Sequence, residues 1–201
     1  MTVTPLIAGN WKMNTDLASA TALAAAVAKG ALGGADLLVC PPFPWLSAVR
    51  AALGTGVVAL GAQDCHPAAA GAHTGDVSAA MLAELGCQAV IVGHSERRAE
   101  VKRGGHGETS KLVRDKVLAA QMAGLRSIVC VGETLAERKS GDTLGVVGAQ
   151  LRQSLPDTCS AGDIVIAYEP VWAIGSGLTP NVEQIGAVHA HIRKALTRRF
   201  G

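Results

Sequence analysis

A carboxylate at the end of an apolar run is the first candidate for chemistry in this chain. Glu169 follows the run 164–168, and a small, mostly apolar segment comes directly after it. A carboxylate in this position can act as a general base, and a small apolar loop beside it can close over a site and expel water. The residues expected to form this lid are Pro170, Val171, Trp172, Ala173, Ile174, Gly175, Ser176, Gly177 and Leu178.

Two other polar clusters could complete such a site. Lys12 follows the first apolar run and His94 follows a later one. Considered alone, a lysine in a loop is usually a solvated charge, and a histidine after an apolar run is usually a satisfied core residue. A cation, an imidazole and a carboxylate at three strand ends would together indicate acid–base chemistry if the strands wind in order and bring them to one cavity.

The elements that must position these residues are short apolar runs alternating with longer helical stretches. Gly30 and Gly124 are predicted to end the first two helices, and Thr179 and Pro180 to cap and begin the third. The predicted strands are 6–8, 37–40, 57–62, 89–92, 127–131 and 164–168, and the punctuated helices are 20–29, 112–123 and 182–199. The strands are apolar on both faces, which is typical of a parallel sheet covered by helices.

Six strand–helix units without a linker predict one α/β domain over residues 1–201. The alanine-rich helix at 20–28 can lie close to a curved sheet, which favours a barrel over a bundle. In a parallel barrel the strand ends that carry chemistry meet on one face. The fold class that we expect is therefore a TIM (β/α)8-type barrel, with its polar clusters at the carboxyl ends of the strands.

Composition and charge restrict the partners. The chain has 201 residues, 49% of them hydrophobic and 17% charged, with a net charge of only +2. Its basic residues are scattered apart from two Arg pairs, so we expect neither nucleic acid nor a membrane as a partner. We see no leader segment and no apolar run of the roughly 18 residues that a span needs, which predicts a cytoplasmic protein. Five cysteines without C-x-x-C spacing argue against disulfides and a zinc site.

The polar clusters, with their flanking residues, resemble the triosephosphate isomerase family from Leu6 to roughly Arg193. The matching segments are Asn10-Trp11-Lys12-Met13-Asn14, Gly61-Ala62-Gln63, Gly71-Ala72-His73-Thr74-Gly75, Gly93-His94-Ser95-Glu96-Arg97-Arg98, Val129-Cys130-Val131-Gly132-Glu133-Thr134 and the lid. The resemblance implies interconversion of dihydroxyacetone phosphate and glyceraldehyde 3-phosphate through an enediolate. It implies a small phosphorylated three-carbon substrate, with no cofactor and no metal.

The resemblance also implies a role for each residue. Glu169 would remove the carbon-bound proton, with its basicity raised by desolvation, and His94 would donate to the substrate carbonyl. A neutral imidazole suits that donor, and the family is itself a known example of such tuning. Lys12 would balance the negative charge. The supporting residues are Asn10 on the same oxygens, the backbone near Gly175 on the phosphate, Ser95 opening a short helix, and Glu96 as an anchor.

The segment 63–75 is long for a strand–helix connection, which usually has about 2–6 residues. In the family this loop docks into a neighbouring subunit, so we expect a homodimer in which Thr74 reaches the active site of the partner subunit. Asp64 stands where asparagine is more usual. His66 and His73 could be interpreted as a metal pair, but without a carboxylate or cysteine framework we favour packing at the interface.

Two departures from the family pattern affect the expectation. Residues 101–105 look like an insertion in the loop after His94. The sequence ends at Gly201, which predicts a barrel that is C-terminally truncated after six units, without the loops that hold phosphate after strands seven and eight. Activity would then be impaired, and the open edges of the first and sixth strands would be covered by a moved helix, a second chain or residues beyond those given.

Three alternatives were weighed against the isomerase. A catalytically silent scaffold would keep the fold without the phosphate site. Another phosphate-handling barrel enzyme is disfavoured because Lys12, His94 and Glu169 match the isomerase in order and context. A dinucleotide-binding loop at 175–177 is rejected, since the third glycine is missing and no helix follows directly.

Overall fold

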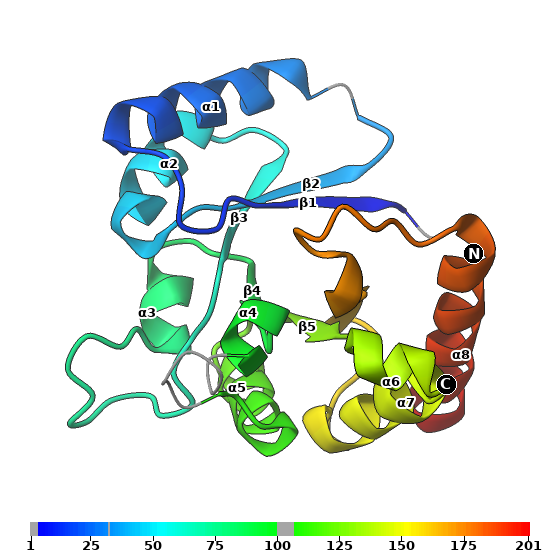
Figure 1. Ribbon diagram of the computed structural model, residues 1–201. Helices are drawn as coiled ribbons and strands as arrows, with labels where there is room; N and C mark the ends of the chain where they lie inside the picture. The colour runs from blue at the N-terminus through cyan, green and yellow to red at the C-terminus, as the bar shows by residue number, and fades with distance from the viewer. Residues whose placement is uncertain (1–3, 32, 100–106) are drawn as a thin grey trace.

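The chain forms a single six-stranded parallel sheet. The computed structural model describes residues 4–31, 33–99 and 107–201. The strands lie side by side in the order β1-β2-β3-β4-β5-β6, the same as their order in the sequence (Figure 1). Their bounds are β1 Leu6–Asn10, β2 Asp36–Cys40, β3 Val58–Ala62, β4 Ala89–Val92, β5 Arg126–Val131 and β6 Ile164–Tyr168. Each predicted strand is confirmed, with its ends within two residues.

The register brings the carboxyl ends of the strands to one rim. Asn10 at the end of β1 pairs with Cys40 at the end of β2, and Val131 pairs with Tyr168 across β5 and β6. All the pairings are parallel. The segments that follow the strands therefore leave from the same side of the sheet, as the barrel expectation requires.

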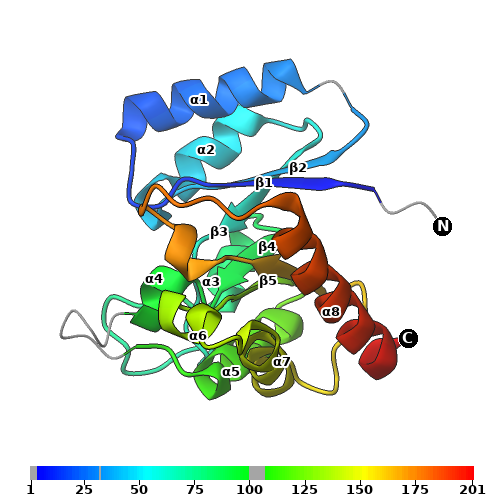
Figure 2. The same cartoon turned by 45° about the vertical axis from the view of Figure 1, so that its right-hand side comes forward.

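Helices connect the strands and pack on one another around the outside (Figures 1 and 2). Helix α1 packs on α2, α5 packs on α7, and α7 packs on α8. Their bounds are α1 Leu17–Gly30, η1 Phe43–Trp45, α2 Leu46–Leu53, α3 Ala79–Glu84, α4 Ser95–Arg98, α5 Ser110–Met122, α6 Leu135–Lys139, α7 Thr143–Ser154, η3 Val171–Ala173 and α8 Val182–Phe200. Within the described ranges, no helix is both long and apolar enough to cross a membrane.

Two of the predicted helix ends are wrong. Gly30 is the last residue of α1 rather than its cap, and the extended Ala31 follows it. Helix α8 is capped by Asn181 and not by Thr179, because Asn181 and Gln184 hydrogen-bond reciprocally: the Asn181 side chain accepts from the Gln184 N–H at 2.8 Å, and the Gln184 side chain accepts from the Asn181 N–H at 3.0 Å. This capping box satisfies two helix-end N–H groups at once.

The core lies on both faces of the sheet. Along β4, Val90 and Val92 pack toward the helices, whereas Ala89 and Ile91 belong to a second cluster on the other face. That second cluster also contains Leu38, Cys40, Ile128 and Cys130. Side chains buried on both faces are what the unbroken apolar runs predicted. All five cysteines are buried and unpaired.

The outer strands have one neighbour each among the described residues, β2 for β1 and β5 for β6. Residue Ile7 in the middle of β1 remains 62% exposed, while α8 packs on β6 and α7. A helix moved over the open side, one of the three options considered from the sequence, is therefore not what this part of the chain forms. The described residues build six strands of a TIM-barrel fold and do not close it into an eight-stranded ring.

Candidate active site

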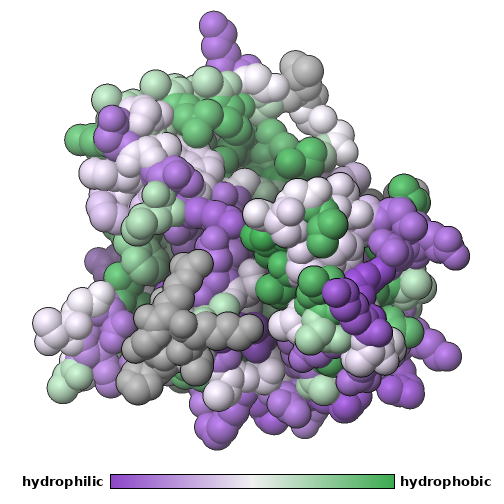
Figure 3. Space-filling view, viewed as in Figure 1, coloured by the Kyte–Doolittle hydropathy of each residue, from purple (hydrophilic) through white to green (hydrophobic). Residues whose placement is uncertain are grey.

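A cleft of about 750 Å³ opens at the carboxyl rim of the sheet. The segment after β1, the start of α4 and the segment after β3 form its walls. The lining residues are Asn10, Lys12, Met13, Asn14, Phe43, Gln63, Asp64, His94, Glu96 and Arg97. Helix α4 lies beside the segment after β6 (Figure 2), and hydrophilic residues gather at the middle of the face shown in Figure 3. Two of the three predicted catalytic residues thus line one cleft, and the third lies against one of them.

His94 and Glu169 are in direct contact. The Nε2 atom of His94 lies 3.0 Å from Oε1 of Glu169, and His94 is only 6% exposed. On the other side of the ring, Nδ1 accepts the backbone N–H of Glu96 at 3.2 Å. Since Nδ1 accepts a hydrogen bond, the hydrogen of the neutral ring must be on Nε2. The local fold therefore fixes one tautomer, with its N–H directed at the carboxylate.

This arrangement follows from the turn that links β4 to α4. His94 is the N-cap of α4, so its Nδ1 satisfies one of the N–H groups that a helix start leaves without a partner. The next residue, Ser95, donates its backbone N–H to Oε2 of Glu169 at 3.2 Å. Both carboxylate oxygens are thus held by N–H groups from the same short segment.

These hydrogen bonds favour the charged form of Glu169. Burial is the largest single influence and acts to raise its pKa, but the hydrogen bond and electrostatic attraction of His94, together with the hydrogen bonds from Ser95, outweigh burial and lower the pKa. The expectation of a carboxyl made more basic by desolvation is therefore not met in this state. A substrate that took over the N–H of His94 would remove part of that stabilisation and leave burial to raise the pKa.

Lys12 is held in the cleft by three neighbours. Its backbone has a positive φ of 52° and donates to Oδ1 of Asn10 at 3.0 Å. Gln63 donates its side-chain amide to the carbonyl oxygen of Lys12 at 2.9 Å, and equally to that of Cys40. The ammonium of Lys12 lies 3.0 Å from Oε1 of Glu96, the residue expected to act as an anchor. A non-glycine residue in this backbone region costs free energy, and such strain concentrates at functional sites.

The predicted lid is fixed at its base and exposed at its tip. Trp172, within η3, donates its indole N–H to Glu133 at 2.9 Å. The tip carries the exposed residues Ile174 and Leu178 and a positive φ of 66° at Gly175. Gly175 is not among the residues that line the cleft. The lid therefore stands away from the cleft, and a movement of the tip would be needed to cover it.

The sequence reasoning assigned no role to Glu133, which is completely buried beneath the lid. It accepts hydrogen bonds from the Tyr168 hydroxyl at 3.1 Å, from the Trp172 indole and from Arg138 at 3.2 Å. Burial and the Glu133 carboxylate raise the pKa of Tyr168 to about 12. The preceding Gly132 is required, because a Cβ there would lie 1.7 Å from the carbonyl oxygen of Glu169. The available signal was a charged residue two positions after an apolar strand, which does not identify its partners.

The sequence and the fold were both compared with known proteins. A family model described as triosephosphate isomerase matches residues 5–201. The chain belongs to the triosephosphate isomerase family. The resemblance identified from the motifs is thereby confirmed, and with it the membership of the TIM-barrel fold.

Individual members of the triosephosphate isomerase family are similar over nearly all of the chain. The triosephosphate isomerase of Bradyrhizobium diazoefficiens is 53% identical over 200 residues, 98% of this chain and 78% of that protein. The one of Rhodopseudomonas palustris is 56% identical, over 98% of this chain and 77% of that protein. A crystal structure of triosephosphate isomerase from Bartonella henselae superposes with a TM-score of 0.86 at 44% identity, covering 99% of this chain and 78% of the other.

A buried charge cluster lies beside the cleft, and Asp64 belongs to it. The ammonium of Lys116 lies 2.7 Å from Asp64 and 2.6 Å from Glu108, and Arg97 pairs with both carboxylates. Burial is the main influence on Asp64 and raises its pKa, whereas the two cations lower that of Glu108 against its own burial. The aspartate at this position, where the family more often has asparagine, thus provides a second negative charge for Lys116.

The loop 63–75 lines the cleft of its own chain only at its first two residues, Gln63 and Asp64. Thr74 at its tip is exposed. The rings of His66 and His73 lie 3.9 Å apart, and Asp76, a carboxylate that the sequence reasoning missed, completes a possible ligand group within 4.8 Å. However, Nδ1 of His66 accepts the N–H of Ala68 at 3.1 Å, which leaves the ring proton on Nε2. For Nε2 to bind a metal, its hydrogen would have to move to Nδ1, which would break the hydrogen bond from Ala68. The group therefore gives no support to a metal site.

The apparent insertion at 101–105 lies outside the described residues, so its effect on the loop after His94 stays a prediction. Its described flanks are Ala99 and Gly107.

Proposed function

We infer that this protein is a triosephosphate isomerase, which interconverts dihydroxyacetone phosphate and glyceraldehyde 3-phosphate by proton transfer through an enediolate. The observation that carries the inference is the contact between His94 and Glu169 at 3.0 Å beside a cleft that contains Lys12. Relatives that share about half of the sequence carry the same name. A catalytically silent scaffold, the alternative from the sequence, has no observation in its favour.

Glu169 is the base in this proposal. Its lowered pKa means that the carboxylate is charged at neutral pH before substrate binds. Substrate bound in the cleft would take the His94 N–H away from Glu169, and closure of the lid would remove water from the site. Both changes raise the basicity of the carboxylate when the carbon-bound proton is transferred. Glu169 then returns the proton to the neighbouring carbon, which completes the isomerisation.

His94 is the proposed electrophile. The hydrogen on Nε2 can be donated to the carbonyl oxygen whose charge grows as the enediolate forms. Because Nδ1 accepts the Glu96 N–H, the ring is neutral while it donates. A neutral donor of this kind is the known arrangement in this enzyme family.

Lys12 and Asn10 are the proposed contacts to the negatively charged oxygens of the substrate. The ammonium of Lys12 is placed in the cleft and would face the negative charge of the enediolate and the phosphate. Glu96, which holds the ammonium at 3.0 Å, keeps it in position and does not react. The Asn10 side chain accepts the backbone N–H of Lys12 at 3.0 Å, which leaves its amide N–H groups for substrate oxygens.

The lid would supply the remaining contacts. Its tip, including Gly175, is exposed and free to move over the cleft, while Trp172 anchors its base to Glu133. In barrels of this type the phosphate is held largely by loops after strands seven and eight. Within these 201 residues the proposed phosphate contacts are the backbone near Gly175 and the ammonium of Lys12.

We propose in addition that the protein is a cytoplasmic glycolytic enzyme that works as a homodimer. The exposed loop 63–75 is the proposed contact, with Thr74 entering the active site of the partner subunit. Its base is held by a hydrogen bond of 2.8 Å from the N–H of His66 to the carbonyl oxygen of Val77, which makes it a preformed surface rather than a loose segment.

Isomerisation in deuterated water tests the proposed chemistry. Dihydroxyacetone phosphate is supplied, and the product is followed by proton NMR. We expect glyceraldehyde 3-phosphate in which part of the product carries deuterium on carbon, because a proton held on Glu169 exchanges with solvent. Absence of isomerisation by folded protein would exclude the function, and a product entirely without deuterium would contradict transfer through an exchanging carboxylate.

A further inference from the structure

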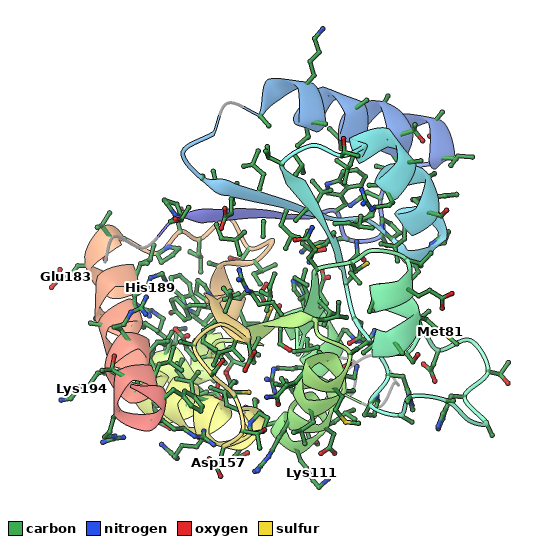
Figure 4. The ribbon with its side chains drawn as sticks, turned by 180° about the vertical axis from the view of Figure 1, so that it is seen from behind. Met81, Lys111, Asp157, Glu183, His189 and Lys194 are labelled. Atoms are coloured by element: carbon green, nitrogen blue, oxygen red, sulfur yellow. The ribbon has the colours of Figure 1, made fainter. Side chains whose placement is uncertain are left out.

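A groove of about 580 Å³ lies between α7 and α8, on the outer helices and away from the proposed active site. This volume is within the range of small-molecule sites, about 300–1,000 Å³. Its apolar side is formed by the half-buried Ala195 and Leu196 of α8, above the buried Leu151 of α7 and the buried Leu155 directly after that helix. Figure 4 shows α8 from behind, with the Lys194 side chain projecting from the helix.

The other side of the groove is basic. No acidic residue is among those that line it. Arg199 is already engaged, because it pairs with Asp157 and donates to the carbonyl oxygen of Leu155 at 2.7 Å. The lining side chains that form no hydrogen bond or ion pair with any other described residue are those of Arg152, His191, Lys194 and Arg198. Three permanent cations and an imidazole therefore share one groove without a counter-charge.

The helix dipole explains only part of this arrangement. Basic residues in the last turn of a helix are favoured by the partial negative charge at its end. Arg152 and Arg198 lie in the last turns of α7 and α8 and fit that explanation. His191 and Lys194 lie further inside α8, where the effect has decayed, so they need another reason.

A glycine in the middle of α7 brings two of these groups together. Gly148 is buried, and a Cβ on it would lie 3.1 Å from Nε2 of His191 and 3.3 Å from Nη1 of Arg152. Glycine in a helix interior destabilises the helix relative to alanine. Here its lack of a side chain lets an imidazole nitrogen from α8 and a guanidinium nitrogen from α7 converge on one point.

We propose that this groove binds a phosphorylated small molecule of the nucleoside polyphosphate class. The phosphates would contact Arg152, His191, Lys194 and Arg198, with bidentate hydrogen bonds from the guanidinium groups. The apolar part would lie on Ala195 and Leu196. The proposal does not depend on the isomerase assignment, because none of these residues lies in the cleft of Lys12 and His94.

The test is a calorimetric titration of the purified protein with ATP at low salt. We expect saturable binding that weakens as salt screens the charges. Arg152→Ala and Lys194→Ala should each weaken it by about tenfold, the loss of one charge-assisted hydrogen bond. Lys29→Ala, which removes an exposed lysine from the distant α1, should leave it unchanged. Lys12→Ala should also retain it, which separates the groove from the active-site cleft.

Gly148→Ala distinguishes a built site from a diffuse positive surface. This variant keeps every charge but places a methyl group between His191 and Arg152, so we expect weaker ATP binding with an unchanged circular dichroism spectrum. Inorganic tripolyphosphate should bind more weakly than ATP, because it leaves the apolar side of the groove unused. No saturable ATP binding, equal weakening by Lys29→Ala, or an unaffected Gly148→Ala variant would each overturn the proposal.

Discussion

At the scale of single residues, the proposed chemistry depends on how the two nitrogens of His94 are used. The backbone N–H of Glu96 occupies Nδ1, and Glu169 lies 3.0 Å from Nε2. One histidine therefore both lowers the pKa of Glu169 and carries the hydrogen that we propose it donates to the substrate carbonyl. In the proposed mechanism Glu169 is charged before substrate binds, and it becomes more basic when substrate takes over the N–H of His94.

The lowered pKa of Glu169 has a consequence for stability against pH. A carboxyl with a folded-state pKa below its ordinary value of 4.5 stabilises the fold above that value, and this contribution is lost as pH falls through the lower folded-state pKa. We expect wild-type protein to lose more stability than Glu169→Gln as the pH is lowered from 7 to below 4.5. Urea unfolding of both proteins at several pH values measures this difference, and parallel curves would show that the folded state does not hold the carboxylate.

At the scale of elements, the lid and the helices around the cleft are secured by buried charges that are not adjacent in the sequence. Glu133 after β5 joins Tyr168 of β6 to Trp172 of η3. Lys116 of α5 joins the segment after β3 to the segment before α5 through Asp64 and Glu108. Glu133 therefore fixes the start of the proposed lid, and Lys116 fixes two segments beside the cleft.

Trp172→Phe removes the indole hydrogen bond to Glu133 and keeps an aromatic ring at the base of the lid. We expect a turnover number several-fold lower, because the lid closes less accurately, with a loss of about 1 kcal/mol in the free energy of unfolding. Trp45→Phe in η1 is the matched control, since the Trp45 side chain forms no hydrogen bond among the described residues. Steady-state kinetics compare them, and equal turnover in the two variants would contradict an anchoring role.

Lys116→Met removes the cation between two buried carboxylates. Lys116 is 3% exposed, so Asp64 and Glu108 would keep only Arg97, and we expect a loss of about 3–5 kcal/mol in the free energy of unfolding. Lys111→Met on the same helix removes a lysine that is 83% exposed and paired only with Asp115, and it should cost at most about 1 kcal/mol. Chemical denaturation checks both values, and similar losses would show that the buried cluster does not hold the cleft.

At the scale of the whole molecule, the sequence predicts the strand order and the parallel register, because apolar runs mark the strands. It also predicts the convergence of Lys12, His94 and Glu169, because parallel winding brings the strand ends to one rim. The capping of α8 was missed, since Asn181 and Gln184 satisfy each other and outweigh the signal from Thr179 and Pro180. The roles of Glu133 and Lys116 could not be predicted, because their partners are distant in the sequence.

The loop 63–75 should control whether two copies of the protein form a dimer. We expect wild-type protein to sediment as a dimer, and Thr74→Arg to sediment as a monomer with little activity, because a long charged side chain would enter the contact. Thr197→Arg, at an exposed position on α8, should leave both properties unchanged. Analytical ultracentrifugation compares the variants, and a Thr74→Arg dimer of normal activity would place the interface elsewhere.

The most direct test of the central claim is the isomerisation rate of Glu169→Gln beside that of Glu183→Gln. Both changes replace a carboxylate with an amide of the same shape, but Glu183 is exposed in the first turn of α8 and is not among the residues that line the cleft. If Glu169 transfers the proton, the first variant should be slower by about 10²–10⁴-fold while the second keeps the wild-type rate. A Glu169→Gln protein that isomerises triose phosphates at the rate of Glu183→Gln would contradict the account.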